Sequence, residues 1–133
     1  MTRFIDTNIF IYATSAHPEF GSISREILFR VEKGESAVTS SIVLCELAWV
    51  LEARGKQSQI NNLFELITSY DSVKILDTTL DDLIVASLYI TKYGIDFDDA
   101  VNLSIMEREG INEVYSNDKK HLGKIPSINL VFQ

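Results

Sequence analysis

Short apolar segments alternate with longer segments of helical periodicity along this chain, and this alternation restricts the possible folds more than any other feature. The short segments have the length and composition of strands and fall at residues 2–6, 36–40, 72–77, 112–118 and 127–132. The longer segments repeat apolar residues at helical spacing and fall at residues 8–15, 22–35, 41–55, 58–70, 79–94 and 98–110. Strands that alternate with helices need crossover connections. The sequence therefore predicts an α/β fold with a mainly parallel sheet and helices on both of its faces.

The ends of the predicted helices carry recognisable start and stop signals. Thr7 or Asn8 is available to cap the first helix, and Ser40 or Ser41 stands at the start of the helix over residues 41–55. Glycines stand at or within one residue of the ends of four of the helical segments, at Gly34, Gly55, Gly94 and Gly110.

Length and cysteine content place the chain in a broad class. Its 133 residues predict one domain over residues 1–133, large enough to bury a hydrophobic core. The one cysteine, Cys45, excludes an internal disulfide framework and fits a reducing compartment. No stretch approaches the roughly 20 apolar residues that span a bilayer, and no long apolar segment precedes Asp6. We therefore expect a cytoplasmic protein with no membrane partner.

Acidic residues outnumber basic ones, and the formal net charge is -7 at pH 7. Taken alone, this charge argues against non-specific nucleic-acid binding, because the phosphate backbone attracts a basic surface. It suits a cation-binding site or a basic protein partner better. Net charge describes long-range fields and not the chemistry of a site, so the placement of individual acids has to decide.

Two aspartates directly follow predicted strands. Asp6 ends the first strand, and Asp118 follows the strand that ends at Tyr115 or Ser116. In an open parallel sheet, ligands bind outside the carboxyl ends of the strands. Asp6 and Asp118 are therefore predicted to share one rim of the sheet, although Asn117–Asp118 is also a good turn sequence.

A glutamate faces inward on the predicted helix over residues 41–55. At 100° per residue, Glu46 lies in the middle of an apolar arc, between Ile42, Trp49 and Ala53 on one side and Val43 and Val50 on the other. An inward glutamate is costly unless it is paired or coordinates a metal. The structural alternative is a glutamate that extends to the surface or pairs with an arginine.

Three acids crowd the start of the predicted helix over residues 98–110, at Asp96, Asp98 and Asp99. Acids at a helix N-terminus cap it and complement its dipole, but three acids exceed what one cap needs. Asp99 shares a face with Leu103 and Met106 and so points partly inward, whereas the direction of Asp98 stays open.

Four of these acidic residues lie on two strand ends and two helices that can converge in the fold. They are Asp6, Glu46, Asp99 and Asp118. Carboxylates forced together without a cation repel one another and raise one another's pKa. Hard divalent cations such as Mg²⁺ and Mn²⁺ prefer carboxylate oxygens together with water and phosphate oxygens. The pattern therefore predicts a site for Mg²⁺ or Mn²⁺ that acts on a phosphoryl group.

At these residues the chain resembles the PIN-domain nucleases, in the segments FIDTNIFIY, SSIVLCELAWVL, DFDDAVNLSIMEREGI and VYSNDKKHL. The resemblance covers essentially the whole chain. It implies a three-layer α/β/α sandwich around a parallel sheet, and a metal-dependent ribonuclease site of three or four acids. Carried over position by position, the catalytic and metal-binding residues are Asp6, Glu46, Asp99 and Asp118, with Asn8 and Ser116 in support.

Within this family, Asp99 is preferred to Asp98 as the ligand because it directly precedes Ala100. Single-domain members of this length are similar to VapC-type toxins, which implies an RNA substrate, an antitoxin partner and a homodimer. The alternatives are a non-toxin PIN nuclease of RNA processing and a catalytically silent interaction module. A further alternative is a phosphatase of the haloacid dehalogenase type, which needs a second acid two residues after the first. This chain has Asn8 at that position, so the phosphatase motif is missing.

A ribonuclease also implies basic residues that hold RNA. The candidates lie beside Asp118 or at the end of the helix that carries Glu46, and they are Lys119, Lys120, Lys124, Arg54 and Lys56. The alternative for each is an ordinary solvated surface residue. We expect His121 at the surface or against the backbone, and Trp49 and Phe64 in the core or in dimer contacts.

Overall fold

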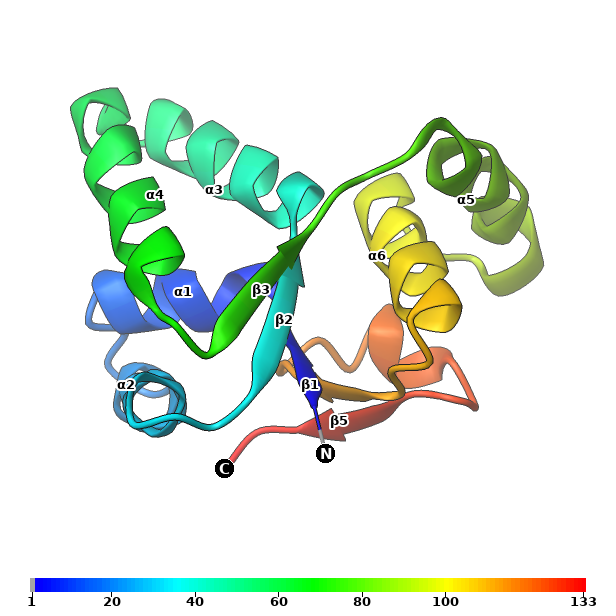
Figure 1. Ribbon diagram of the computed structural model, residues 1–133. Coiled ribbons are helices and arrows are strands. Elements are labelled where there is room, and N and C mark those ends of the chain that lie inside the picture. Colours follow the sequence, from blue (N-terminus) through cyan, green and yellow to red (C-terminus); the bar gives the residue numbers. More distant parts are fainter. Residues whose placement is uncertain (1) are drawn as a thin grey trace.

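Strands and helices alternate along residues 2–133, the part of the chain that the computed structural model describes (Figure 1). The strands are β1 (Arg3–Ile5), β2 (Ala37–Ser40), β3 (Val73–Leu76), β4 (Glu113–Tyr115) and β5 (Asn129–Val131). The α-helices are α1 (Thr7–Thr14), α2 (Gly21–Glu32), α3 (Ser41–Ala53), α4 (Ile60–Ser69), α5 (Leu80–Tyr93) and α6 (Phe97–Arg108). Two short 3-10 helices lie in connections, η1 (Gln57–Gln59) and η2 (Leu122–Lys124). This is the order predicted from the sequence.

The sheet is parallel throughout, with β1 at its centre. Its order across the described residues is β3-β2-β1-β4-β5. Phe4 of β1 pairs with Val38 of β2 on one side and with Val114 of β4 on the other. Because all of the pairings are parallel, the carboxyl ends of the strands lie on one rim. Asp6 and Asp118 follow two neighbouring strands at that rim.

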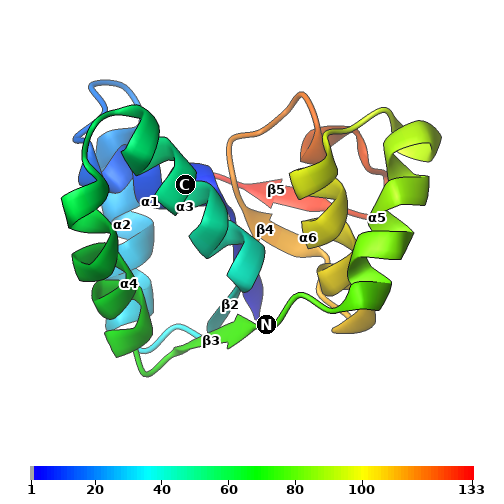
Figure 2. The ribbon, with the colours of Figure 1, turned by 90° about the horizontal axis from the view of Figure 1, so that it is seen from above.

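Helices cover both faces of the sheet (Figures 1 and 2). α1, α2 and α4 gather on one side with α3 beside them, and α5 and α6 pack together on the other. α3 also contacts α6, so the two helical layers meet. The predicted three-layer α/β/α sandwich is thus confirmed. Within residues 2–133, none of the helices is both long and apolar enough to cross a membrane.

The core is centred on β1 and α6. Phe4 and Ile5 of β1 have no exposed surface. On α6, all of the residues from Asp99 to Met106 are buried, including the polar Asn102. α6 is buried on every side because the sheet lies on one side and α5 packs along another. A helix in this position has no polar face, so helical periodicity could not show which of its acids points toward the rim.

An ion pair between a buried aspartate and an exposed arginine joins α5 to α6. The side chain of Asp82 is 2% exposed and lies 3.2 Å from Nη2 of Arg108. Its carboxylate also accepts hydrogen bonds from Ser104 Oγ at 2.9 Å and from the backbone N–H of Thr79 at 2.9 Å. Although burial opposes the change, these donors lower the pKa of Asp82 below its usual value. The pair therefore helps to hold α6, whose first turn carries Asp99.

The start of α1 differs from the prediction. The N-cap is Asp6, whose Oδ1 accepts the backbone N–H of Thr7 at 2.8 Å, so Thr7 and Asn8 were the wrong candidates. The N-cap of α3 is Ser40, one of the two serines predicted, and its Oγ accepts the N–H of Val43 at 3.2 Å. Asp6 thus has a structural role in addition to its place at the rim.

The predicted burial around Glu46 is only partly correct. Val43 and Leu47 are buried, but Trp49 is 58% exposed and Ala53 is also exposed. Glu46 is half-buried, at the edge of the buried surface of α3 and not in its middle. Trp49 therefore lies outside the core, because the helices that contact α3 do not cover that side of it, and the alternative of a dimer contact stays a prediction. Phe64 of α4 is half-buried.

Candidate functional site

A cleft of about 560 Å³ opens at the carboxyl rim of the sheet. Its walls come from the start of α1, from α3, from the first turn of α6 and from the segment that follows β4. The lining residues are mainly polar and acidic, and they are Asp6, Thr7, Asn8, Ile11, Tyr12, Glu46, Asp98, Asp99, Asn117, Asp118, Lys119, Lys120 and His121. All four predicted acids are therefore in one cleft.

Asp6 is held rigidly at the bottom of this site. Its side chain is only 5% exposed, and its second oxygen, Oδ2, accepts the hydroxyl of Ser116 at 2.6 Å. Burial raises the pKa of Asp6 to about 6, with the charges of Asp118 and Asp98 adding to the rise and the hydrogen bonds from Ser116 and Thr7 opposing it. Asp6 is thus fixed in position and unfavourably charged at neutral pH.

Ser116 links Asp6 to two other polar residues of the cleft, Asp118 and Asn8. Besides donating to Asp6, its Oγ accepts the backbone N–H of Asp118 at 3.0 Å and lies 3.4 Å from Nδ2 of Asn8. Ser116 has no exposed surface. The turn after β4 is therefore tied to the start of α1, and this places Asp118 beside Asp6. The oxygen Oδ1 of Asn8 is buried and has no hydrogen-bond partner within residues 2–133.

Asp99 points into the cleft without a donor. It is 8% exposed, and within the described residues no hydrogen bond or ion pair reaches its carboxylate. Burial raises the pKa of Asp99 to about 9, and the charges of Asp6, Asp98 and Asp118 add to the rise. One carboxylate oxygen from each of Asp6, Asp99 and Asp118 lies within 4.8 Å of the others.

Glu46 and Asp98 face the same cleft from α3 and α6. Burial is the main reason that the pKa of Glu46 is raised to about 9. A hydrogen bond with Asp98 and the charge of Asp98 raise it further. Oε1 of Glu46 lies 3.5 Å from Nδ2 of Asn102, whose Oδ1 accepts the hydroxyl of Ser40 at 2.6 Å. The structure thus places Asp99 with Asp6 and Asp118, and places Asp98 next to Glu46.

This arrangement of acids fits a bound divalent cation. Three carboxylates from separate elements approach one another although the pKa values of Asp6 and Asp99 are raised there, and no lysine or arginine forms an ion pair with the three within residues 2–133. A cation would remove this repulsion and supply the partner that the Asp99 carboxylate lacks. Asp6, Asp99 and Asp118 are the residues that could hold it, with Glu46 at the opposite wall.

The predicted basic residues divide into two groups. Lys119 and Lys120 line the cleft beside Asp118. Lys124 in η2, and Arg54 and Lys56 after α3, are not among its lining residues. The geometry therefore brings only the first pair to the acids.

Comparison of the sequence with models of protein families identifies the family of this chain. The model of the PIN domain matches residues 3–126. The chain belongs to the PIN-domain family. No curated protein matches the chain. The family match agrees with the four segments on which the resemblance was based.

Solved structures share the fold of this PIN domain. The toxin VapC20 of Mycobacterium tuberculosis, which cleaves the sarcin–ricin loop, is 20% identical over 90% of this chain and 92% of that one, with a TM-score of 0.76. VapBC2 of Rickettsia felis, bound to a DNA fragment from its promoter, is 24% identical over 98% of both chains, with a TM-score of 0.73. DNA-bound VapBC of Salmonella typhimurium is 21% identical over 98% of both chains, with a TM-score of 0.70.

Two residues at this PIN-domain site were not among the predicted site residues: Asn102, which contacts Glu46, and His121, which lines the cleft. Asn102 lies three residues after Asp99, and this helical spacing was a usable signal for a side chain on the same side. His121, which was expected at the surface or against the backbone, is half-buried and lines the cleft. No periodic pattern marks His121, because it lies in the irregular segment between β4 and η2.

Proposed function

We propose that this protein is a divalent-metal-dependent endoribonuclease that hydrolyses RNA phosphodiester bonds, with one PIN domain over residues 1–133 and Asp6, Glu46, Asp99 and Asp118 as its catalytic and metal-binding residues. The observation that carries the proposal is the group of three carboxylates within 4.8 Å in a solvent-open cleft. Membership of the PIN-domain family supports the same reading. The cofactor would be Mg²⁺ or Mn²⁺, since both prefer carboxylate oxygens.

Each group in the cleft has a defined task in this proposal. Asp6, Asp99 and Asp118 would hold the cation together with Glu46 from the opposite wall, and Ser116 would keep Asp6 oriented through its 2.6 Å hydrogen bond. A divalent cation bound there supplies a Lewis acid for phosphodiester hydrolysis. Lys119 and Lys120 line the same cleft and can attract the phosphates of a single strand. No histidine, serine or cysteine nucleophile is required.

A cleavage assay tests the proposal. The protein is incubated with mixed cellular RNAs and Mn²⁺ or Mg²⁺, with and without a chelator, and the new RNA ends are mapped. We expect cleavage that the chelator abolishes and that added metal restores. A protein that cuts no RNA and binds neither cation would contradict the nuclease reading and favour a silent interaction module.

We propose further that the nuclease is the toxin of a type II toxin–antitoxin pair, acting in the cytoplasm. The structural neighbours that support this are the toxin VapC20 and two VapBC complexes. The test is induced expression in a bacterial host. Growth arrest that an inactive variant relieves supports the toxin, whereas unaffected growth with intact RNA cleavage supports a nuclease of RNA processing.

The partners in this proposal are a cognate antitoxin and a second copy of the chain. Three exposed apolar residues at four-residue spacing on α5, which are Leu80, Ile84 and Leu88, support an association with protein. Light scattering of the purified chain is expected to give the mass of a homodimer. Co-purification with the product of a neighbouring gene, with loss of RNA cleavage in the complex, is expected for an antitoxin.

Replacing Ser116 by alanine is expected to weaken divalent-cation binding by about 10–100-fold, because Asp6 loses the hydroxyl that orients it. Stability should also fall by about 1–3 kcal/mol, since the backbone N–H of Asp118 loses its acceptor. Mn²⁺ titration calorimetry and urea unfolding measure the two effects. Ser104→Ala is the matched control, because this buried hydroxyl donates to Asp82 and does not line the cleft. Ser104→Ala should lower stability and leave Mn²⁺ affinity unchanged.

Replacing both Lys119 and Lys120 by alanine is expected to weaken RNA binding and reduce its salt dependence. Each lost phosphate contact should reduce the slope of log K against log salt by about 0.7 for a single strand. Binding of an uncleaved RNA, measured by fluorescence anisotropy at several salt concentrations in Ca²⁺, gives this slope. Lys33→Ala is the control, since Lys33 lines a different hollow together with Gly34 and Tyr70. Equal slopes for the double variant and the wild type would assign both lysines to the solvated surface.

A further inference from the structure

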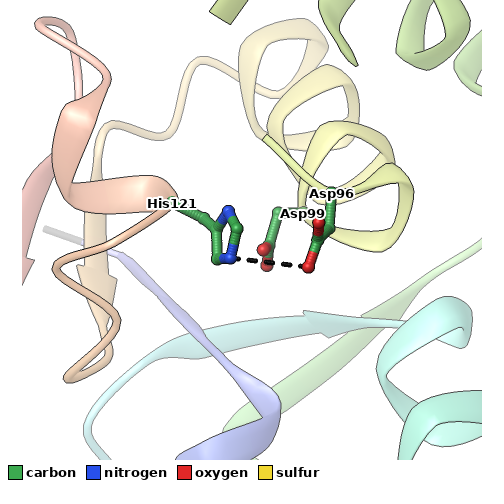
Figure 3. A group of neighbouring side chains, drawn as sticks. All are labelled: Asp96, Asp99 and His121. Carbon is green, nitrogen blue, oxygen red and sulfur yellow. Dashed lines mark ion pairs between the residues drawn. The ribbon is translucent and has the colours of Figure 1, made fainter. Parts of the chain in front are cut away.

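A second group of potential metal ligands lies beside the three carboxylates. One ligand atom from each of Asp96, Asp99 and His121 lies within 4.8 Å of the others. Figure 3 shows these side chains converging, with Asp96 and Asp99 from the start of α6 and His121 from the segment after β4. The group shares Asp99 with the first set and adds an imidazole nitrogen, a ligand type that the first set lacks.

Asp96 does not do what its position suggests. It is the N-cap residue of α6, but its side chain makes no capping hydrogen bond. Its Oδ2 instead lies 3.4 Å from Nε2 of His121 (Figure 3). The side chain of Asp96 is 72% exposed, so a carboxylate there could remain in water at no cost. The turn away from the helix end is therefore unexplained by capping.

Asp99 has coordinating capacity for two cations. It is more than nine-tenths buried, and within residues 2–133 its carboxylate has no donor. It belongs to both groups, the one with Asp6 and Asp118 and the one with Asp96 and His121. A carboxylate has two oxygens and can bridge two cations about 3.5–4 Å apart, as in two-metal sites that act on phosphodiesters.

His121 is positioned by a residue of the first group. Its backbone N–H donates to Oδ1 of Asp118 at 3.0 Å, and its side chain is 19% exposed. The contact fixes the turn that directs the ring toward Asp96. An imidazole nitrogen suits first-row transition metals, whereas Mg²⁺ strongly prefers oxygen ligands.

We propose that Asp96, Asp99 and His121 form a second cation site that takes a first-row transition-metal ion in preference to Mg²⁺ and shares Asp99 with the first site. The proposal rests on the proposed function only in that the first site also binds a cation. The simple alternative is an ion pair between His121 and Asp96 that binds no metal.

The test is Mn²⁺ binding to tag-free full-length protein, followed by titration and by pulsed electron paramagnetic resonance. The wild type should bind two Mn²⁺ ions per chain, and the spectrum should show coupling to a directly bound imidazole nitrogen. In His121→Gln this coupling should vanish, and the second binding step should weaken by at least about tenfold. A large excess of Mg²⁺ should displace Mn²⁺ from the first site before it removes the nitrogen coupling.

The chain has one other histidine, which provides the matched control. Nδ1 of His17 accepts the backbone N–H groups of Glu19 and Phe20 at 3.1 and 3.0 Å, so His17→Asn keeps an acceptor there and should keep the nitrogen coupling. If His121→Gln does not fold, Asp96→Asn serves instead, since this exposed side chain makes no capping bond. It should lose the second Mn²⁺ and keep the first.

The outcomes separate the two proposals. A single Mn²⁺ without nitrogen coupling, unchanged in His121→Gln, overturns the second site even if RNA is cleaved. Nitrogen coupling that depends on His121 in a protein that cuts no RNA retains the second site and removes the nuclease. Coupling that persists in His121→Gln but vanishes in His17→Asn assigns the bound ion elsewhere and overturns the inference.

Discussion

Asp6→Asn is expected to abolish metal-dependent RNA cleavage while leaving the fold intact. The fall in the cleavage rate should be at least about 100-fold, because the variant loses one of the three carboxylates that would hold the cation. The fold should survive because asparagine is as good an N-cap as aspartate and can accept the same N–H of Thr7. Activity and stability should therefore separate in this variant.

Single-turnover cleavage of a mapped RNA site, with thermal unfolding of the same samples, measures both quantities. Asp81→Asn is the matched control, since Asp81 lies in the first turn of α5, is exposed and does not line the cleft. It should cleave like the wild type. An unfolded Asp6→Asn would assign Asp6 mainly to capping, and a folded variant with wild-type cleavage would remove it from the site.

The metal-free protein is expected to lose stability as the pH rises from about 4 to about 9, and divalent metal should reverse this loss. Three carboxyl groups of the cleft have pKa values above those of free carboxyl groups. The pKa is about 6 for Asp6 and about 9 for both Glu46 and Asp99. In this window the folded state holds more protons than the unfolded state, so the free energy of unfolding falls with rising pH. Asp6 alone contributes about 1 kcal/mol of the loss between about pH 5 and pH 8.

Thermal unfolding from about pH 5 to pH 9, in a chelator and in excess Mn²⁺ or Mg²⁺, measures the effect. A cation binds the ionised carboxylates, so its stabilisation should be small at low pH and large at high pH. Asp99→Asn should flatten the metal-free profile, because it removes one buried charge, whereas Asp81→Asn should keep the wild-type slope. If the free energy of unfolding of the metal-free protein rises with pH instead, the pKa values of these carboxyl groups are not raised in the folded state.

Much of the site was accessible from sequence because it depends on rules of chain connection. Apolar strands that alternate with helices imply a parallel sheet, and a parallel sheet brings the residues after β1 and β4 to one rim. Asp6 and Asp118 could be paired on that basis without any knowledge of side-chain packing. Glu46 was found for a weaker reason, because the arc that marked it includes the exposed Trp49.

The acids at the start of α6 show where helical periodicity no longer predicts the direction of a side chain. Burial on every side of α6 removes the polar face that a helical wheel needs, so the face that Asp99 shares with Leu103 and Met106 indicated burial but periodicity left the direction of Asp98 open. Their directions follow from the placement of α6 as a whole, which packs along α5 and is tied to it through Asp82 and Arg108. That contact joins residues 26 positions apart, and its geometry is absent from either local segment.

The order of strands and helices, the parallel sheet and the rim shared by Asp6 and Asp118 follow from the amino-acid sequence, since they rest on local periodicity and on the limited ways in which strands can be connected. Long-range packing settled the rest. It oriented Asp6 through Ser116, left the carboxylate of Asp99 without a donor, and turned His121 toward Asp96. These features depend on contacts between elements distant in the chain, where no local pattern records which side chain meets which.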